Sequence, residues 1–204
     1  VDCDDYVPKN YFLKLYENIM NNKSDLAIGS VVNVYGTKLE YTYAPECVVS
    51  FSDCFIQDRQ NFLELNKKFL IYGPFNKLYK TDIVKGHDIM FLENICYGED
   101  LLFNLSYIKF CNSISSSKEP FYFYDRKNQN SLSQKFREDM FENGLQINLS
   151  LKKCFENLNF WGANEQEFVY RRIFDDAYNA IFSLWNNQCH LTFCGKTKKI
   201  SSCL

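Results

Sequence analysis

The sequence is poor in the features that identify several large classes of protein. Of its 204 residues only two are histidines and four are prolines, and no two of its cysteines have the CxxC spacing of zinc and redox sites. No apolar run approaches the length of a membrane span. Lysine and arginine do not outnumber aspartate and glutamate, and the net charge of −2 argues against a dedicated nucleic-acid binder.

Nine cysteines are present, and they are scattered along the chain. This pattern favours reduced core thiols in a cytoplasmic protein. An alternative is a metal held by Cys189, His190 and Cys194, although their spacing fits no common zinc pattern.

Apolar and aromatic residues are abundant. Hydrophobic residues make up 46% of the chain and aromatic residues 17%, which is enough for the core of one good-sized domain, with or without a helical appendage.

Patterns of strand type and helix type alternate along the first two thirds of the sequence and predict an α/β fold. A helix is predicted from Pro8, and Ser52 or Asp53 is predicted to cap a second helix that ends near residue 69. Thr81 is predicted to cap a short helix ending near Gly86, and a further helix follows Gly98. The predicted strands are 26–36, 38–44, 75–79 and 119–126, and two long helices are predicted at 135–158 and 165–185.

The chain opens with Asp2, Asp4 and Asp5, in the sequence VDCDDYVPKN. Carboxylates in such a cluster suit Mg²⁺ or Mn²⁺, which prefer oxygen ligands. An equally good interpretation is that they are acidic residues placed favourably near a helix N-terminus.

A second acidic pair, Glu99 and Asp100, begins the helix in YGEDLLFNLSYI. It could cap that helix, or it could supply the general base that an attacking hydroxyl needs. A third polar segment begins with Arg126 and Lys127, directly after a predicted strand. Arg126 could bind a diphosphate, whereas a solvated turn is the better interpretation of Lys127.

Four segments in this order resemble the successive motifs of family 2 glycosyltransferases with the nucleotide-diphospho-sugar transferase (GT-A) fold. They are VDCDDYVPKNYFLKLYENI, YGPFNKLYKTDIVKGHDIMF, YGEDLLFNLSYI and FYFYDRKNQNSLS. The resemblance covers about residues 1 to 135. It implies a bacterial enzyme of capsule, lipopolysaccharide or teichoic-acid synthesis.

The resemblance also implies roles for individual residues. The DXD motif falls on Asp2-Cys3-Asp4, with Asp5 beside it, and implies a Mg²⁺ or Mn²⁺ site that also contacts the nucleotide. The ED motif falls on Glu99-Asp100 and implies that Asp100 is the catalytic base. Residues 73–79 would border the pocket for sugar and acceptor, and residues 126–131 would close over the diphosphate, although many relatives have a histidine there and this chain has none.

In the family, the half-sheet that holds the nucleotide base precedes the DXD motif. We therefore expect a C-terminal portion of such an enzyme. It would have a truncated GT-A-like mixed sheet with flanking helices in residues 1–134 and a helical extension in residues 135–204. We also expect an exposed apolar face where the missing half would dock, and self-association through it.

The implied reaction is inverting, metal-dependent transfer from a nucleotide-diphospho-sugar, first of all a UDP-sugar, to a saccharide, lipid-linked or cell-surface polymer acceptor. The implied location is cytoplasmic, at the inner face of the cell membrane. One alternative is a non-catalytic module that binds a saccharide or a partner. Another is an aspartate-dependent phosphatase, whose motif would require threonine or valine where this chain has Asp5-Tyr6.

Overall fold

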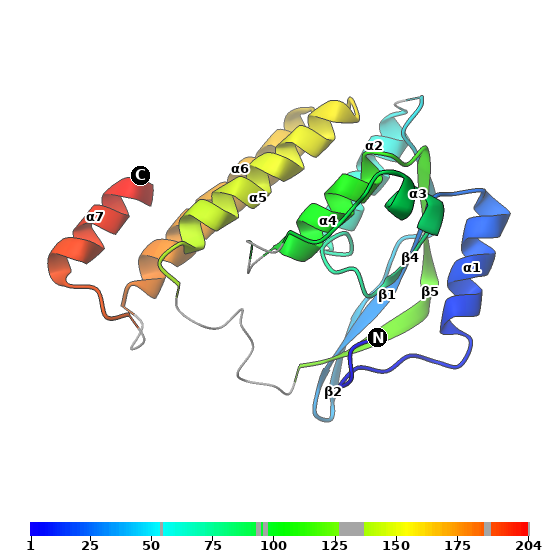
Figure 1. Ribbon diagram of the computed structural model, residues 1–204, viewed down its shortest axis with the longest axis horizontal. Helices are drawn as coiled ribbons and strands as arrows, with labels where there is room; N and C mark the ends of the chain where they lie inside the picture. Colours follow the sequence, from blue (N-terminus) through cyan, green and yellow to red (C-terminus); the bar gives the residue numbers. More distant parts are fainter. Residues whose placement is uncertain (54, 93–94, 96–97, 127–136, 186–188, 204) are drawn as a thin grey trace.

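A computed structural model describes residues 1–53, 55–92, 95, 98–126, 137–185 and 189–203. It confirms the predicted α/β class, with a mixed sheet that has helices on both faces (Figure 1). Three further helices follow the sheet in the chain and lie to one side of it (Figure 1).

The sheet is organised around strand β1 (Leu26–Tyr35), in which seven consecutive residues from Leu26 are buried. The antiparallel strands β2 (Lys38–Thr42) and β4 (Lys77–Tyr79) pair with different parts of β1. On its other side β1 pairs in parallel with β5 (Ser113–Asp125), and β5 pairs antiparallel with β3 (Cys47–Ser50). Parallel pairing of β1 with β5 explains why β1 lacks the alternating pattern of a half-exposed strand.

Two features of the sheet were not predicted. Strand β3 was missed, and β5 begins at Ser113 rather than at residue 119. The first part of β5 is rich in serine and does not resemble a buried strand. Its hydroxyl groups are nevertheless satisfied inside the sheet, since Ser115 Oγ lies 2.6 Å from Ser24 Oγ and Ser116 Oγ donates to the Pro45 carbonyl at 2.5 Å.

Helix α1 (Tyr11–Asn22) covers one face of the sheet and starts later than predicted. Pro8 is not its first residue, because Pro8 accepts a hydrogen bond from the Tyr11 N–H in the turn that leads into the helix. Leu15 and Ile19 are buried against the sheet at helical spacing.

The other face of the sheet is covered by α2 (Ile56–Lys67) and α4 (Glu99–Ile108), while the short α3 (Thr81–Gly86) links β4 to the segment before α4. The predicted caps were wrong for α2 and α3. The cap positions belong to Phe55 and Lys80, neither of which bonds through its side chain, so packing of the helices outweighs local capping here.

The C-terminal helices are α5 (Met140–Asn157), α6 (Ala163–Ser183) and α7 (Phe193–Cys203). The first two were predicted with boundaries a few residues away, and α7 was not predicted. Ile147, Leu151 and Phe155 of α5 share one core with the sheet and with α4. The predicted boundary after residue 134 lies outside the described residues.

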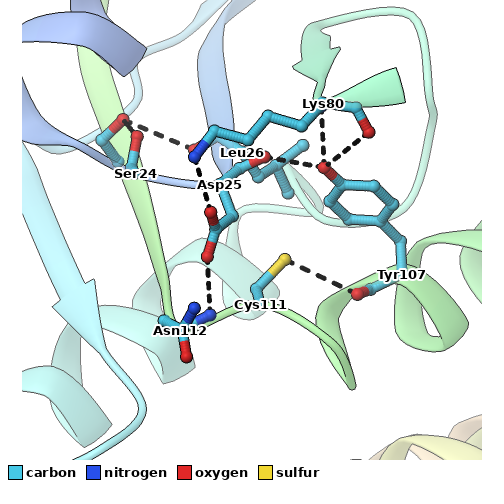
Figure 2. A network of polar contacts seen from close by, with 8 residues as sticks. Ser24, Asp25, Leu26, Lys80, Tyr107, Cys111 and Asn112 are labelled. Carbon is cyan, nitrogen blue, oxygen red and sulfur yellow. Dashed lines mark hydrogen bonds and ion pairs between the residues drawn. The ribbon is translucent and has the colours of Figure 1, made fainter. Parts of the chain in front are cut away.

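A buried polar network fixes the C-terminal half of α4 to the sheet (Figure 2). Asp25, at the start of β1, accepts hydrogen bonds from Lys80 Nζ and from the Asn112 N–H, both at 2.7 Å. The Tyr107 hydroxyl of α4 donates to the Asp25 carbonyl at 2.7 Å and accepts from the Lys80 N–H at 2.8 Å. The network therefore holds the helix whose first turn carries Glu99 and Asp100.

Apolar side chains are exposed on the outer side of α1, namely those of Phe12, Leu13, Tyr16 and Met20. Exposed apolar side chains of this kind were expected from the sequence. Self-association of the chain through them stays a prediction. Within the described residues, no helix combines the length and the apolar character that crossing a membrane would require.

Candidate active site

Asp5 is held by the last strand of the sheet. One of its carboxylate oxygens accepts from the Tyr122 hydroxyl at 2.7 Å, and the other accepts from the Asp125 N–H at 2.8 Å. Burial raises the pKa of Asp5, while these two hydrogen bonds oppose the rise. Tyr122 is itself fully buried, and its ring packs against Tyr11 of α1, so the position of Asp5 is set by the core.

Asp2 and Asp4 are exposed on the same turn. The Asp2 N–H donates to the Tyr122 hydroxyl at 3.4 Å, and the Asp5 N–H donates to the Asp2 carbonyl at 3.1 Å. The turn is thus anchored through its backbone and through Asp5, and it presents the carboxylates of Asp2 and Asp4 to solvent.

Glu99 and Asp100 occupy the first turn of α4, directly after Gly98. Gly98 occupies the N-cap position with a φ of 81°, in the left-handed region that favours glycine. A Cβ at Gly98 would also lie 2.1 Å from a side-chain carbon of Ile147 in α5. Gly98 occupies the N-cap position and no described side chain caps α4, so the interpretation of Glu99 or Asp100 as the cap was wrong.

Among the described carboxylates of the site, Asp100 has the most strongly shifted pKa. Its pKa is raised to about 6, first by burial and then by the negative charge of Glu99, while Lys77 opposes the rise and Asp2 adds to it. Among the described residues, no hydrogen bond reaches its side chain. The contribution of Asp2 brings the two acidic groups, 98 positions apart in the sequence, into one electrostatic neighbourhood.

Lys77 lies behind Asp100 and was not identified from the sequence. It is almost fully buried in β4, and its Nζ donates to the carbonyls of Leu70 and Gly73 and to Asn76 Oδ1. Burial lowers its pKa, whereas the Asp100 carboxylate raises it. Three oxygen acceptors match the three donors of an ammonium group. Lys77 is the only charged residue in the segment of residues 73–79, and this was the signal that could have identified it.

The segment between α2 and β4, and β4 itself, are held by a second buried side chain that was not identified from the sequence. Asn104 of α4 donates to the carbonyls of Ile71 and Tyr72 at 2.7 and 2.8 Å and accepts from the Tyr79 hydroxyl at 2.6 Å. The segment predicted to border the sugar pocket, 73–79, is thereby fixed against the helix that carries Asp100.

Arg126 lies at the end of β5. Its Nε donates to Asn33 Oδ1 at 3.1 Å, and its guanidinium lies 4.3 Å from the centre of the Tyr124 ring. The contact with a diphosphate stays a prediction. The rest of the predicted closing segment, residues 127–131, lies outside the described residues.

The metal prediction rests on donor chemistry. In the described ranges no three side chains of histidine, cysteine, aspartate or glutamate form a group that could hold a metal ion, and this covers Cys189, His190 and Cys194 as well. Mg²⁺ commonly takes only one or two protein carboxylates, with substrate phosphates as further ligands. The exposed carboxylates of Asp2 and Asp4 fit that mode of binding, and the metal-binding roles of Asp2, Asp4 and Asp5 stay predictions.

Neither a protein-family model nor a curated protein matches the chain. Among solved structures, it is similar to S. aureus TarS 1–349 in complex with UDP-GlcNAc, with a TM-score of 0.62 and 19% identity over 100% of this chain and 54% of that one. For TarS 1–349 in complex with UDP, the TM-score is 0.57 and the identity 19%, over 97% of this chain and 51% of that one. A further structure of TarS 1–349 gives a TM-score of 0.55 and 20% identity, over 100% and 52%.

The chain therefore spans about half the length of the TarS chains that it resembles. At these identities the likeness shows the fold alone: this chain has a fold similar to part of TarS 1–349.

Proposed function

We propose that this chain carries the metal side and the acceptor side of a glycosyltransferase that uses a nucleotide-diphospho-sugar. The observation that carries the proposal is the half-buried Asp100 carboxylate at a rigid helix start, within electrostatic reach of the exposed N-terminal carboxylates. The likeness of the fold to a structure in complex with UDP-GlcNAc supports it and favours a UDP-sugar as donor. Membership of family 2 rests on the order of the sequence motifs.

Asp100 is the proposed general base. The acceptor hydroxyl oxygen forms a bond to the anomeric carbon of the donor sugar, the bond from that carbon to the diphosphate oxygen breaks, and the hydroxyl proton passes to the Asp100 carboxylate. With a pKa of about 6, this carboxylate is ionised at neutral pH and is a stronger proton acceptor than an ordinary aspartate. Attack in line with the leaving group inverts the configuration at the anomeric carbon.

The N-terminal carboxylates belong to the donor side in this proposal. Asp2 and Asp4 would hold Mg²⁺ or Mn²⁺, which supplies positive charge to the leaving diphosphate when bound. Asp5 orients the turn through its bonds to Tyr122 and to the Asp125 N–H. Arg126 would contact the diphosphate from the end of β5. The proposed acceptor is a saccharide, a lipid-linked acceptor or a cell-surface polymer, and the proposed location is the cytoplasm, at the inner face of the cell membrane.

The test is sugar transfer by the full-length protein with UDP-GlcNAc and with a panel of other nucleotide sugars. We expect UDP release that depends on an added saccharide acceptor, and a product whose anomeric configuration is opposite to that of the donor. Nuclear magnetic resonance of the product measures both the linkage and the configuration. Binding of saccharide without acceptor-dependent UDP release would instead establish the non-catalytic module.

A further inference from the structure

The outer surface of α6 carries aromatic side chains at intervals of four residues. Tyr170, Phe174, Tyr178 and Phe182 are between 51% and 70% exposed, and Trp185 extends the series at 64%. Residues four apart on a helix lie on one face. These five side chains therefore form one continuous surface, the α6 aromatic stripe.

The stripe does not hold α6 in place. Val169, Ala180 and Leu184 are buried on the opposite side of the α6 segment. On that side Arg172 of α6 donates to Asn148 of α5 at 2.8 Å. Since α6 is already docked through this buried side, the three central rings, Phe174, Tyr178 and Phe182, are not needed for its packing. At the two ends of the stripe, the Tyr170 ring lies 6.1 Å from the Trp161 ring, and Lys196 Nζ of α7 lies 5.9 Å from the centre of the Trp185 ring.

The area of the stripe is large for a surface with no partner. An aromatic side chain presents roughly 150–250 Å², so the five side chains at their observed exposure leave on the order of 600 Å² uncovered. Patches of this size on a protein surface are often functional. A stable interface needs about 800 Å² from each partner, which the stripe and its polar border would supply.

The charges beside the stripe favour a protein surface as its partner. Glu167, Arg171 and Asp175 follow each other at four-residue intervals along the stripe, so one cation lies between two anions. A helix that lies on an anionic membrane carries an excess of lysine and arginine on its polar face. A band of aromatic residues with charges of both signs at its edge is typical of paired helices.

We propose that α6 forms a homodimer interface in which two copies of the chain pair their aromatic stripes in antiparallel orientation. The four regularly spaced rings are centred between Phe174 and Tyr178. A two-fold axis at that point places Phe174 of one copy against Tyr178 of the other, and Tyr170 against Phe182. Such an interface is self-complementary and closes at two subunits, and it is independent of the transferase activity.

The test uses sedimentation velocity of the chain over a range of concentrations. We expect the wild-type chain to reach twice its monomer mass. Phe174→Lys alone and Tyr178→Glu alone should each weaken the dimer by roughly thirtyfold or more, as expected for an aromatic residue at the centre of an interface. Because both side chains are exposed, both variants should keep the wild-type circular dichroism spectrum.

Mixing the two single variants distinguishes the antiparallel arrangement from other arrangements. In the antiparallel dimer the two substituted positions face each other as an opposite-charge pair, and the remaining Phe174–Tyr178 contact is unchanged, so an equimolar mixture should dimerise again. A parallel pair would not be restored by mixing. The matched control is Phe55→Lys, at an exposed phenylalanine outside both the α6 aromatic stripe and the exposed side of α1, which should leave the dimer intact.

Three results would overturn the proposal. A wild-type chain that stays monomeric at high concentration would remove the interface. A dimer that dissociates with Phe12→Lys but not with Phe174→Lys would place the contact on α1. A monomeric chain that sediments with phosphatidylcholine–phosphatidylglycerol vesicles, and loses this binding with Phe174→Lys, would make the stripe a membrane contact.

Discussion

The N-terminal turn and the first turn of α4 each carry carboxylates. The two sites differ in how the surrounding residues fix the position of the carboxylate and shift its pKa. Asp5 receives a hydrogen bond on each of its oxygens, one from a buried tyrosine and one from the backbone of β5. Asp100 receives none from the described residues, and its pKa is raised to about 6, chiefly by burial. The first arrangement fixes a geometry, whereas the second prepares a proton acceptor.

This difference determines which substitutions each of the two positions, Asp5 and Asp100, should tolerate. A carboxylate that positions a turn needs acceptor oxygens at two sites, and it does not have to take up or release a proton during the reaction. A carboxylate that takes a proton must ionise close to the operating pH, and burial beside Glu99 meets that need. Substitutions that keep the shape but remove the ionisation should therefore affect the two places very unequally.

The largest effect is expected from Asp100→Asn in the full-length protein. The amide keeps the shape of the side chain but cannot accept the acceptor's proton, so the rate of sugar transfer should fall by roughly a hundred- to ten-thousandfold. Binding of the donor nucleotide should be unchanged. The measurement is transfer under single-turnover conditions beside nucleotide binding by calorimetry.

The same variant should be more stable than the wild-type chain at pH 7.5. Because the pKa of Asp100 is raised from 3.8 to about 6 in the folded state, its carboxyl lowers the stability progressively as pH rises through that range, and the full cost is present above it. The gain should be on the order of 1 to 2 kcal/mol after allowance for solvent screening. Near-normal transfer, or a loss of stability of the size expected for a lost helix cap, would show that Asp100 is structural.

A smaller but still large effect is expected from Asp4→Ala. Loss of even an outer-shell partner costs about 10- to 100-fold in metal affinity, so loss of a direct ligand should shift the manganese response of transfer by at least that much. The measurement is transfer by the full-length protein against manganese concentration. Glu17→Ala, an exposed carboxylate on α1, is the matched control and should leave the response unchanged. An unaltered manganese response in Asp4→Ala would remove the DXD assignment.

Much of the fold was predictable because its signals are local. Buried β1 and the amphipathic pattern of α1 follow from the spacing of apolar residues, and they appear where that spacing places them. The first half of β5 could not be predicted, because its serines are stabilised by partners on distant segments, such as Ser24 for Ser115. Strand β3 was missed as well, and it is only four residues long. The start of α2 was missed because its N-cap residue, Phe55, has no side chain that can accept a capping hydrogen bond.

The site was predictable only in part for a related reason. Motif order identified Asp2, Asp4, Asp5, Glu99 and Asp100, and the raised pKa of Asp100 adds a physical property to that list. The supporting residues Asn104 and Tyr122 could not be identified, because each acts through contacts with residues far away in the sequence. Lys77, whose partners are nearby, was overlooked. Nothing in a single sequence marks a tyrosine in an aromatic-rich strand as the partner of an aspartate at the other end of the chain.

A third effect concerns pH. Because the base must be ionised, transfer should decline about tenfold for each pH unit below a pKa of about 6 and should level off above it. Glu99→Gln removes a negative charge that raises the pKa of Asp100, so the acidic limb should move to lower pH while the plateau rate changes little. The measurement is the single-turnover rate between pH 4.5 and 8. If the acidic side of the pH–rate profile does not shift in Glu99→Gln, a group other than Asp100 determines that pKa.

The smallest effect is expected where the N-terminal turn is held, and Tyr122→Phe tests it. The substitution removes the hydroxyl that donates to Asp5, which should lower the free energy of unfolding by about 1 to 2 kcal/mol at pH 7.5. The loss should shrink as pH falls, because a protonated Asp5 needs that donor less than the carboxylate does. Tyr11→Phe is the matched control, since its hydroxyl donates to the neutral carbonyl of Phe75 at 3.1 Å and its loss should not depend on pH. Urea unfolding of both variants at pH 7.5 and 4.5 measures the difference, and equal pH dependence in the two would show that Asp5 is not stabilised as an anion.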